Sequence, residues 1–203
     1  MLEFAILGLL HDSPMHGYEL RKRLNAQLGM FRAFSYGSLY PTLRRLRQSG
    51  WISEEAPDLA GGDPKPLASR RGKIVYKLTA EGKERFAELL ADVSPDSYED
   101  EGFGVHFAFF AQTDASVRLR ILEGRRRRVE ERREGLRAAL SRTRERLDNY
   151  TLELQRHGLD SVDREVRWLN ELIASERAGT PPTVTTPTLP TPESLGTDKR
   201  RTH

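Results

Sequence analysis

A short stretch of the chain, Ser35 to Trp51, concentrates the hydroxyl and guanidinium groups that bind phosphates and base edges. Leu39, Leu43 and Leu46 recur there at helical spacing, which predicts an apolar stripe packed on a core. The polar and cationic residues on the other sides are Ser38, Tyr40, Thr42, Arg44, Arg45 and Arg47. A helix that is apolar on one side and basic and hydroxylated on the other suits the major groove of DNA.

The charge around this stretch is also segregated. Residues 20–53 contain seven basic residues and no acidic one, and residues 64–80 contain five basic residues and no acidic one. The whole chain carries a formal charge of only +3, so both windows depart from the background. Exclusion of carboxylates favours binding to a polyanion, because each neutralised phosphate releases counterions. The alternative is a solvated helix face, although such faces usually mix both signs of charge.

Length and composition limit the class of protein. A chain of 203 residues can form one large or two small domains. The sequence contains no run of 18 apolar residues, so we expect no membrane span and no membrane partner. Its first residues, Met1 to Phe4, lack the basic region of a signal peptide, and there is no cysteine for a disulfide. These features favour a cytoplasmic location.

Enzyme motifs are missing from the sequence. There is no cysteine nucleophile, no Gly-x-Ser-x-Gly and no glycine-rich phosphate loop after an expected strand. The five histidines are too scattered for the spacing of metal ligands. We therefore expect no enzymatic activity, no metal and no cofactor.

Residues 1–93 are expected to form one compact unit that is mainly α-helical. Apolar spacing predicts helices at residues 2–10, 17–28 and 35–49, strands at 51–53 and 73–78, and a fourth helix that begins at the N-cap Thr79. Gly50 is expected to end the third helix. The fold class is therefore mainly α with a small β-hairpin.

The second half is expected to be helical, with a short aromatic helix near residues 103–113 and a long helix at 114–157. Gly158 would end the long helix, and a last helix would start at Asp160 or Ser161. The apolar positions on the long and last helices are Leu119, Leu122, Val129, Leu136, Leu140, Leu147, Val166, Leu169 and Ile173. Nothing else in the chain is evidently available to cover both seams, so we expect a homodimer interface there. The alternative is an intrachain helical hairpin packed on residues 1–93.

Three motifs carry a resemblance to a known family. They are Pro14–Leu20, Gly37–Leu43 continuing to Gly50–Ile52, and Tyr76–Lys83. Their order and approximate spacing resemble the PadR family of transcriptional regulators over residues 1–93. Residues 103–176 resemble more loosely the helical C-terminal domain of its virulence-activator-like branch, with Trp168 in a matching last helix.

The resemblance implies a winged helix-turn-helix domain at 1–93 and a helical dimerisation and effector domain at 94–178. Nothing in the family accounts for residues 179–203, whose Thr/Pro-rich composition predicts a disordered tail. It implies a homodimer, usually a repressor, that binds a pseudo-palindromic operator in double-stranded DNA. The DNA-binding residues expected on this basis and from the charge pattern are Tyr18, Tyr36, Gly37, Ser38, Tyr40, Pro41, Thr42, Arg44, Arg45, Arg47, Arg70, Arg71 and Lys73. The wing is longer and richer in proline than the family pattern, which leaves open which wing residue reaches DNA.

Some members of the family bind a small aromatic molecule that relieves repression. Phe103, Phe107, Phe110 and Trp168 could line such a site, but aromatic residues at helical spacing more often form an ordinary core. A third reading of the chain is a helical adaptor that uses the winged helix to bind protein. Steep salt dependence would favour DNA binding over this adaptor.

Overall fold

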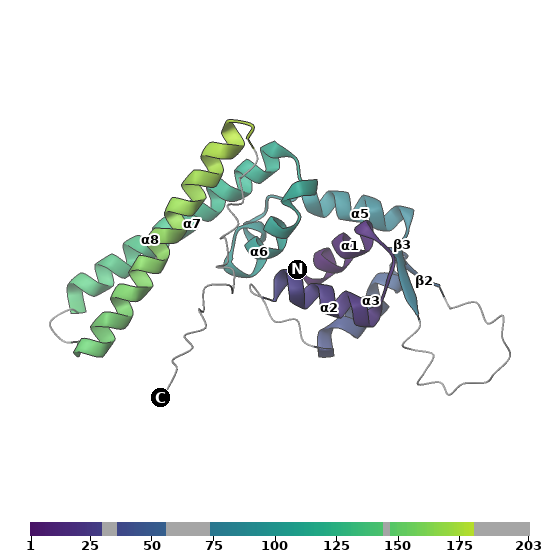
Figure 1. The fold of residues 1–203 in the computed structure, drawn as a ribbon, viewed down its shortest axis with the longest axis horizontal. Helices are drawn as coiled ribbons and strands as arrows, with labels where there is room; N and C mark the ends of the chain where they lie inside the picture. Colours follow the sequence, from purple (N-terminus) through teal and green to yellow (C-terminus); the bar gives the residue numbers. More distant parts are fainter. Residues whose placement is uncertain (30–35, 56–73, 144–146, 181–203) are drawn as a thin grey trace, which may run out of the picture.

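The computed structural model describes residues 1–29, 36–55, 74–143 and 147–180, which are mostly helical with one small sheet (Figure 1). The elements of the first half are α1 (Leu2–Asp12), β1 (Met15–His16), α2 (Gly17–Leu28), α3 (Tyr36–Gln48), β2 (Ile52–Glu55), β3 (Val75–Leu78) and α5 (Ala80–Ala91). Each helix and strand predicted for residues 1–93 is present, and its ends lie within two residues of the predicted ones. The mainly α fold class with a small β-hairpin is confirmed.

A three-stranded antiparallel sheet lies at one side of these helices, in the order β1–β3–β2. Met15 lies opposite Tyr76, and Ile52 lies opposite Leu78. The strand β1 was not predicted, because a two-residue strand is too short to show the alternation that marks a strand. His16 at its end contacts the carbonyl of Ile74 through Nδ1 at 3.2 Å.

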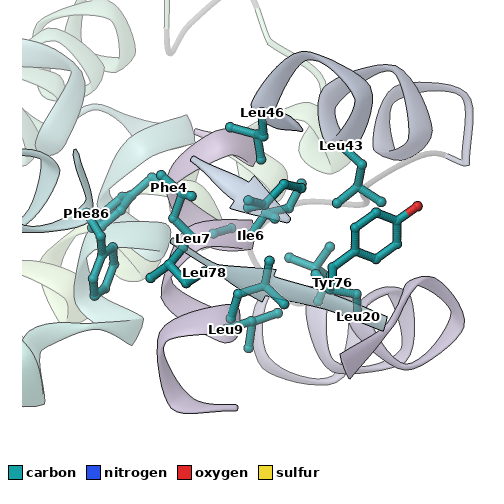
Figure 2. Packing of buried hydrophobic residues seen from close by; sticks show 14 of the residues in the cluster. Phe4, Ile6, Leu7, Leu9, Leu20, Leu43, Leu46, Tyr76, Leu78 and Phe86 are labelled. Carbon is teal, nitrogen blue, oxygen red and sulfur yellow. The ribbon is translucent and has the colours of Figure 1, made fainter. Parts of the chain in front are cut away.

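The core of the first half surrounds α1, whose residues from Phe4 to Leu10 are all buried. Figure 2 shows side chains of α1 packed against Leu43 and Leu46 of α3, Leu78 of β3 and Phe86 of α5. The apolar stripe predicted for α3 is therefore confirmed, and it fixes which side of α3 faces solvent.

Two cap residues join α3 and α5 to the sheet. Gly50 ends α3 in the left-handed conformation with φ at +76°, and the Trp51 amide donates to the Leu46 carbonyl at 3.0 Å. Thr79 caps α5 by accepting a hydrogen bond from the Gly82 amide at 3.0 Å, and its hydroxyl donates to the Gly50 carbonyl at 2.7 Å. The predicted roles of Gly50 and Thr79 are confirmed.

The second half contains η1 (Pro95–Ser97), α6 (Asp100–Ala108), η2 (Phe110–Gln112), α7 (Ala115–Thr143) and α8 (Asn149–Arg177). The long helices α7 and α8 run side by side in opposite directions and form an arm that extends away from the helices of the first half (Figure 1). The prediction of one helix over 114–157 is wrong, as is the prediction that Gly158 ends it. A new helix starts earlier because the Asp148 carboxylate accepts hydrogen bonds from the amides of Tyr150 and Thr151 at 2.9 and 3.0 Å.

The short helix α6 takes part in two apolar cores. Val105 and the adjoining Phe109 are buried with the α1 core, whereas Phe103 is buried with residues of α7 and α8. The Phe109 ring lies so close to α1 that a Cβ on Gly8 would be 2.3 Å from it. The predicted border at residues 93 and 94 therefore does not separate the two cores, because α6 belongs to both.

Within the described ranges, none of the helices combines the length and the apolar character needed to cross a membrane. The predicted tail at 179–203 lies outside the described residues except for Gly179 and Thr180.

The start of α5 packs closely against the backbone that follows α3. A Cβ added at Gly82 would lie 2.0 Å from the carbonyl oxygen of Trp51, which is backbone and cannot rotate away. Gly82→Ala should therefore lower the free energy of unfolding by about 1–3 kcal/mol in urea titrations. The matched control is Gly135→Ala in α7, where a Cβ meets nothing within 4 Å. This control should be neutral or stabilising by up to ~1 kcal/mol, and equal losses in both variants would contradict the contact.

A second prediction concerns the pH dependence of stability. His106 of α6 is 3% exposed and stacks near the Phe4 ring, and burial lowers the pKa of His106 to about 4 from 6.5. Between these pH values the unfolded chain binds a proton at this site and the folded chain does not. Stability should therefore fall by roughly 3 kcal/mol as the pH falls from 6.5 to 4.

Urea unfolding at a series of pH values measures this loss. Asp92 favours the charged imidazole and the amino group of Met1 opposes it, but burial is the largest cause of the shift. His106→Leu should remove about this part of the pH dependence. An unchanged dependence in that variant would assign the loss to other groups.

Candidate nucleic-acid interface

The solvent side of α3 follows directly from its buried side. With about 100° per residue, the positions opposite Leu39, Leu43 and Leu46 form one exposed line along the helix. The residues of this outer line are Gly37, Pro41, Arg44 and Gln48, and all four are exposed. Tyr40 and Arg47 lie on the flank toward the sheet, and Ser38 and Arg45 lie on the opposite flank. Gln48 was missed in the sequence analysis, although its place four residues after Arg44 was a sufficient signal.

Pro41 lies inside α3, one turn after a residue that has no side chain. Proline removes one helical hydrogen bond, and its ring approaches the residue four positions earlier, which here is Gly37. Because Gly37 has no side chain and the proline ring is small, little side-chain volume projects from this part of the exposed face. This part of the face allows close approach of another surface.

The three arginines of α3 differ in their surroundings. Arg44 is exposed and makes no ion pair with any described residue. Arg47 donates to the Glu54 carboxylate at 2.6 Å, and Arg45 lies 3.7 Å from the Glu3 carboxylate. The segregation of charge seen in residues 20–53 therefore does not persist in the fold, because β2 and α1 bring carboxylates to both flanks of α3.

The predicted role of Thr42 is wrong in this structure. Its side chain is 7% exposed, and its hydroxyl donates to the Ser38 carbonyl at 2.8 Å, four residues earlier in the helix. A buried hydroxyl that is already bonded to the backbone cannot donate to DNA. Ser38 itself is exposed on the flank of α3.

The tyrosines are placed at the edge of the same surface. Tyr18, near the start of α2, is 71% exposed and therefore accessible to a partner. Tyr40 is 45% exposed and packs over the start of α2, where a Cβ on Gly17 would lie 3.6 Å from its hydroxyl. Tyr36 belongs to α3, but its side chain lies outside the described residues, as do Arg70, Arg71 and Lys73 of the predicted wing.

The second half of the chain uses its apolar seams internally. The expectation that nothing in the chain covers them is wrong, because α7 and α8 pack on each other. Within a single chain Leu122, Val129, Val166, Leu169 and Ile173 are buried, and Leu119 and Leu136 pack against them. Leu140 and Leu147 are half-buried near the turn of the arm. The intrachain hairpin was the alternative, and it forms because α8 returns antiparallel along α7.

Charged pairs reinforce this hairpin. Arg125 is 8% exposed at its side chain and contacts Asp100 of α6 and Glu165 of α8, each at 2.6 Å. Hydrogen bonds from Arg132 and Arg125 hold the pKa of Asp100 below its usual value. In the run of four arginines that starts at Arg125, Arg128 also pairs with carboxylates, those of Glu99 and Glu131 at 3.7 and 3.5 Å.

The four aromatic residues proposed for an effector site come together in one cluster. The Phe107 ring lies 4.9 Å from the Phe110 ring and 5.3 Å from the Trp168 ring, and Phe103 meets Trp168 edge-on at 6.1 Å. Phe103 is buried, whereas the other three remain partly accessible. The cluster therefore combines a core residue with rings that can meet a ligand.

A groove of about 530 Å³ adjoins this cluster, between η2, the start of α7 and the end of α8. Its lining residues are Phe107, Phe110, Ala111, Ala115, Arg118, Leu122, Leu172, Glu176, Gly179 and Thr180. Arg118 donates to both carboxylate oxygens of Glu176, at 2.9 and 2.8 Å, and to the carbonyl of Phe110 at 3.3 Å. The groove is thus mainly apolar, and its cation is already neutralised. Across the described part of the chain, no cluster of three or more His, Asp or Glu side chains could hold a metal ion.

Comparison with known proteins gives one family match. The model of the transcriptional regulator PadR-like family matches residues 6–88, which contain α2, α3 and the sheet strands β1 to β3. The "Negative transcriptional regulator PadR" of Bacillus subtilis is 28% identical over 103 residues, which are 50% of this chain and 52% of the relative. The "Probable transcriptional regulator Rv1176c" of Mycobacterium tuberculosis is 29% identical over 119 residues, 59% of this chain and 58% of the relative. This chain therefore spans only about half the length of these relatives.

The solved structures that are similar to this chain include Bacillus subtilis PadR in complex with operator DNA. It is 20% identical, with 86% of this chain and 98% of that chain covered and a TM-score of 0.40. The same protein in complex with p-coumaric acid has a TM-score of 0.39, at 20% identity and 87% and 98% coverage.

Proposed function

We propose that this chain, which carries a PadR-like transcriptional regulator domain at residues 6–88, is a sequence-specific DNA-binding repressor. The observation that carries the proposal is the outer line of α3, where Arg44 is exposed and makes no ion pair with a described residue. A guanidinium in this position can bind guanine bidentately or neutralise a phosphate. Gln48, one turn further on, adds an amide of the kind that pairs with adenine.

The proposed DNA-binding surface extends beyond α3. Tyr18 and Tyr40 border it from α2 and α3, and Arg70, Arg71 and Lys73 of the wing are proposed to contact the backbone or minor groove. Thr42 is omitted from this set because its hydroxyl is occupied within α3. The proposed operator is double-stranded and pseudo-palindromic. The proposed function is regulatory rather than enzymatic, and the proposed location is the cytoplasm.

The proposal includes a homodimer, since two linked reading heads bind DNA with avidity. The apolar seam between α7 and α8 is filled within one chain. We therefore propose that the two copies contact each other at the far end of the arm, where α7 ends and α8 begins. There Tyr150 is 90% exposed and Leu154 is 67% exposed, beside the half-buried Leu140 and Leu147. We also propose that residues 1–93 form the DNA-binding unit and residues 94–178 the dimerisation and effector unit, with α6 shared between them.

The proposed effector is a small aromatic molecule that binds the groove beside Phe107 and Phe110. The volume of about 530 Å³ suits a molecule of one or two rings, and the lining is mainly apolar. Bacillus subtilis PadR, which is similar in sequence, has been solved with p-coumaric acid. In this chain Arg118 is bound to Glu176, so ring stacking rather than charge pairing is the proposed source of affinity.

A mobility-shift titration with a duplex from upstream of the chain's own gene tests DNA binding. Arg44→Ala should weaken binding to this duplex by about 1–3 kcal/mol and weaken binding to a scrambled duplex less, if Arg44 reads a base. An equal loss on both duplexes assigns Arg44 to phosphate. The matched control is Arg127→Ala, which removes an exposed arginine of α7. Wild-type affinity of Arg44→Ala would remove the outer line of α3 from the proposal.

Truncation tests the proposed division of the chain. A chain that ends at Val93 lacks Val105 and Phe109, which cover Phe4 and Phe86 in the α1 core. It should unfold at lower urea concentration than a chain that ends at Thr113, with the fluorescence of Trp51 as the signal. Both should be monomeric by light scattering, since neither contains the arm. A dimer of the Val93 chain would place the interface outside α7 and α8.

A further inference from the structure

Two carboxylates lie beside the arginines of α3, although neither belongs to that helix. Glu54 of β2 accepts a hydrogen bond from Arg47 Nη1 at 2.6 Å, and Glu3 of α1 lies 3.7 Å from Arg45 Nη2. The contact to Glu54 is the shorter one and has the geometry of a charge-assisted hydrogen bond. Its partners are 49% exposed at Arg47 and 28% at Glu54. The pair therefore lies at the rim of the surface proposed to meet DNA.

The backbone of Glu54 is fixed by the sheet. Glu54 lies opposite Tyr76 in the β2–β3 register, and Tyr76 is 7% exposed. Figure 2 shows the Tyr76 hydroxyl on the outer side of the core, pointing away from the other labelled side chains. Residues directly opposite in an antiparallel pair have their side chains on the same face of the sheet. In keeping with this placement, burial and, to a smaller extent, the Glu54 carboxylate raise the pKa of Tyr76. The carboxylate is thus an anion held in place between the sheet and the flank of α3.

Stabilisation of the fold does not account for this pair, because an exposed ion pair contributes little to the free energy of folding. Attraction between Arg47 and a phosphate, by contrast, is reduced directly by a carboxylate 2.6 Å from the guanidinium. Such a reduction acts on every DNA sequence, because phosphates carry no sequence information.

We propose that Glu54 is a specificity-determining residue, which orients Arg47 and weakens its general attraction for phosphates. This inference rests on the proposed DNA binding. In a complex with the operator, Glu54 has already oriented Arg47 for its contact, so the negative charge of Glu54 lowers the affinity only a little. On unrelated DNA, where charge supplies most of the affinity, the same anion lowers binding. Glu54 thereby increases the difference in affinity between operator DNA and unrelated DNA.

Glu54→Gln tests this role, since it removes the charge and keeps the size of the side chain. Mobility-shift titrations of the full chain would use the upstream duplex and a scrambled duplex of equal length and composition, over a range of salt concentrations. On the scrambled duplex the variant should bind about 5-fold more tightly at roughly 0.15 M salt, with a salt slope steeper by about one. The gain on the upstream duplex should be smaller, so the ratio of the two affinities narrows.

Two further variants separate positioning from a general change in charge. Glu54→Gln should add nothing to Arg47→Ala, because Glu54 acts through Arg47. Glu88→Gln is the matched control, since Glu88 pairs with Arg85 on α5 at 3.0 Å, and it should leave the ratio unchanged. The inference is overturned if Glu54→Gln binds both duplexes as the wild type does, or if its gain persists without Arg47. A wild-type chain that binds neither duplex would overturn the DNA-binding proposal and this inference together.

Discussion

The burial of α1 is the constraint on which the rest of the structure depends. Seven consecutive residues of this helix, from Phe4 to Leu10, are withdrawn from water, so other elements must cover it on every side. The helices α2, α3 and α5 and the strand β3 contact it directly. The orientation of α3, and with it the direction of Arg44, is therefore a consequence of how α1 is covered. At Gly8 the absence of a side chain admits the Phe109 ring, which ties the second half of the chain to the same core.

The distribution of charge shows how the fold combines stability with a cationic surface. Arginines at the flanks of α3 and in the arm are paired with carboxylates from other elements, such as Glu3, Glu54 and Asp100. Arg44, on the outer line, has no such partner among the described residues. The available cation is thus concentrated at the centre of the exposed helix face. Pairing at the flanks limits the repulsion that a dense group of arginines would otherwise produce.

Much of the first half could be predicted from the sequence because its signals are local. Leucines at helical spacing, the cap Thr79 and the left-handed Gly50 each act within a few residues. The flank contacts could not be predicted in this way, because Glu3 and Glu54 reach Arg45 and Arg47 through the fold. The predicted role of Thr42 was wrong for a related reason, because a hydroxyl in a helix can donate to a carbonyl of the preceding turn instead of to a partner.

The arm was harder to predict than the winged helix. Its apolar seam fits a partner helix from the same chain or from a second copy, and the spacing alone does not distinguish them. The N-cap at Asp148 was the local signal that separates α7 from α8, and it outweighs Gly158, which the helix tolerates although a Cβ there would meet nothing within 4 Å. The aromatic cluster formed from all four predicted residues, because Phe103 and Phe107 of α6 lie one helical turn apart and meet Trp168 of α8, while Phe110 of η2 packs on Phe107. Phe103 and Trp168 nevertheless do not line the adjoining groove, which Phe107 and Phe110 do.

The length of the arm gives small movements a large effect. Each of its helices has 29 residues, which corresponds to about 43 Å of rise. A tilt of about 10° at the end of the arm that adjoins α6 would shift the far end by about 7 Å, roughly two base pairs along a duplex. In the proposed homodimer, an effector that bound in the groove and tilted the arm would therefore change the distance between the two DNA-binding units, while each unit kept its own fold.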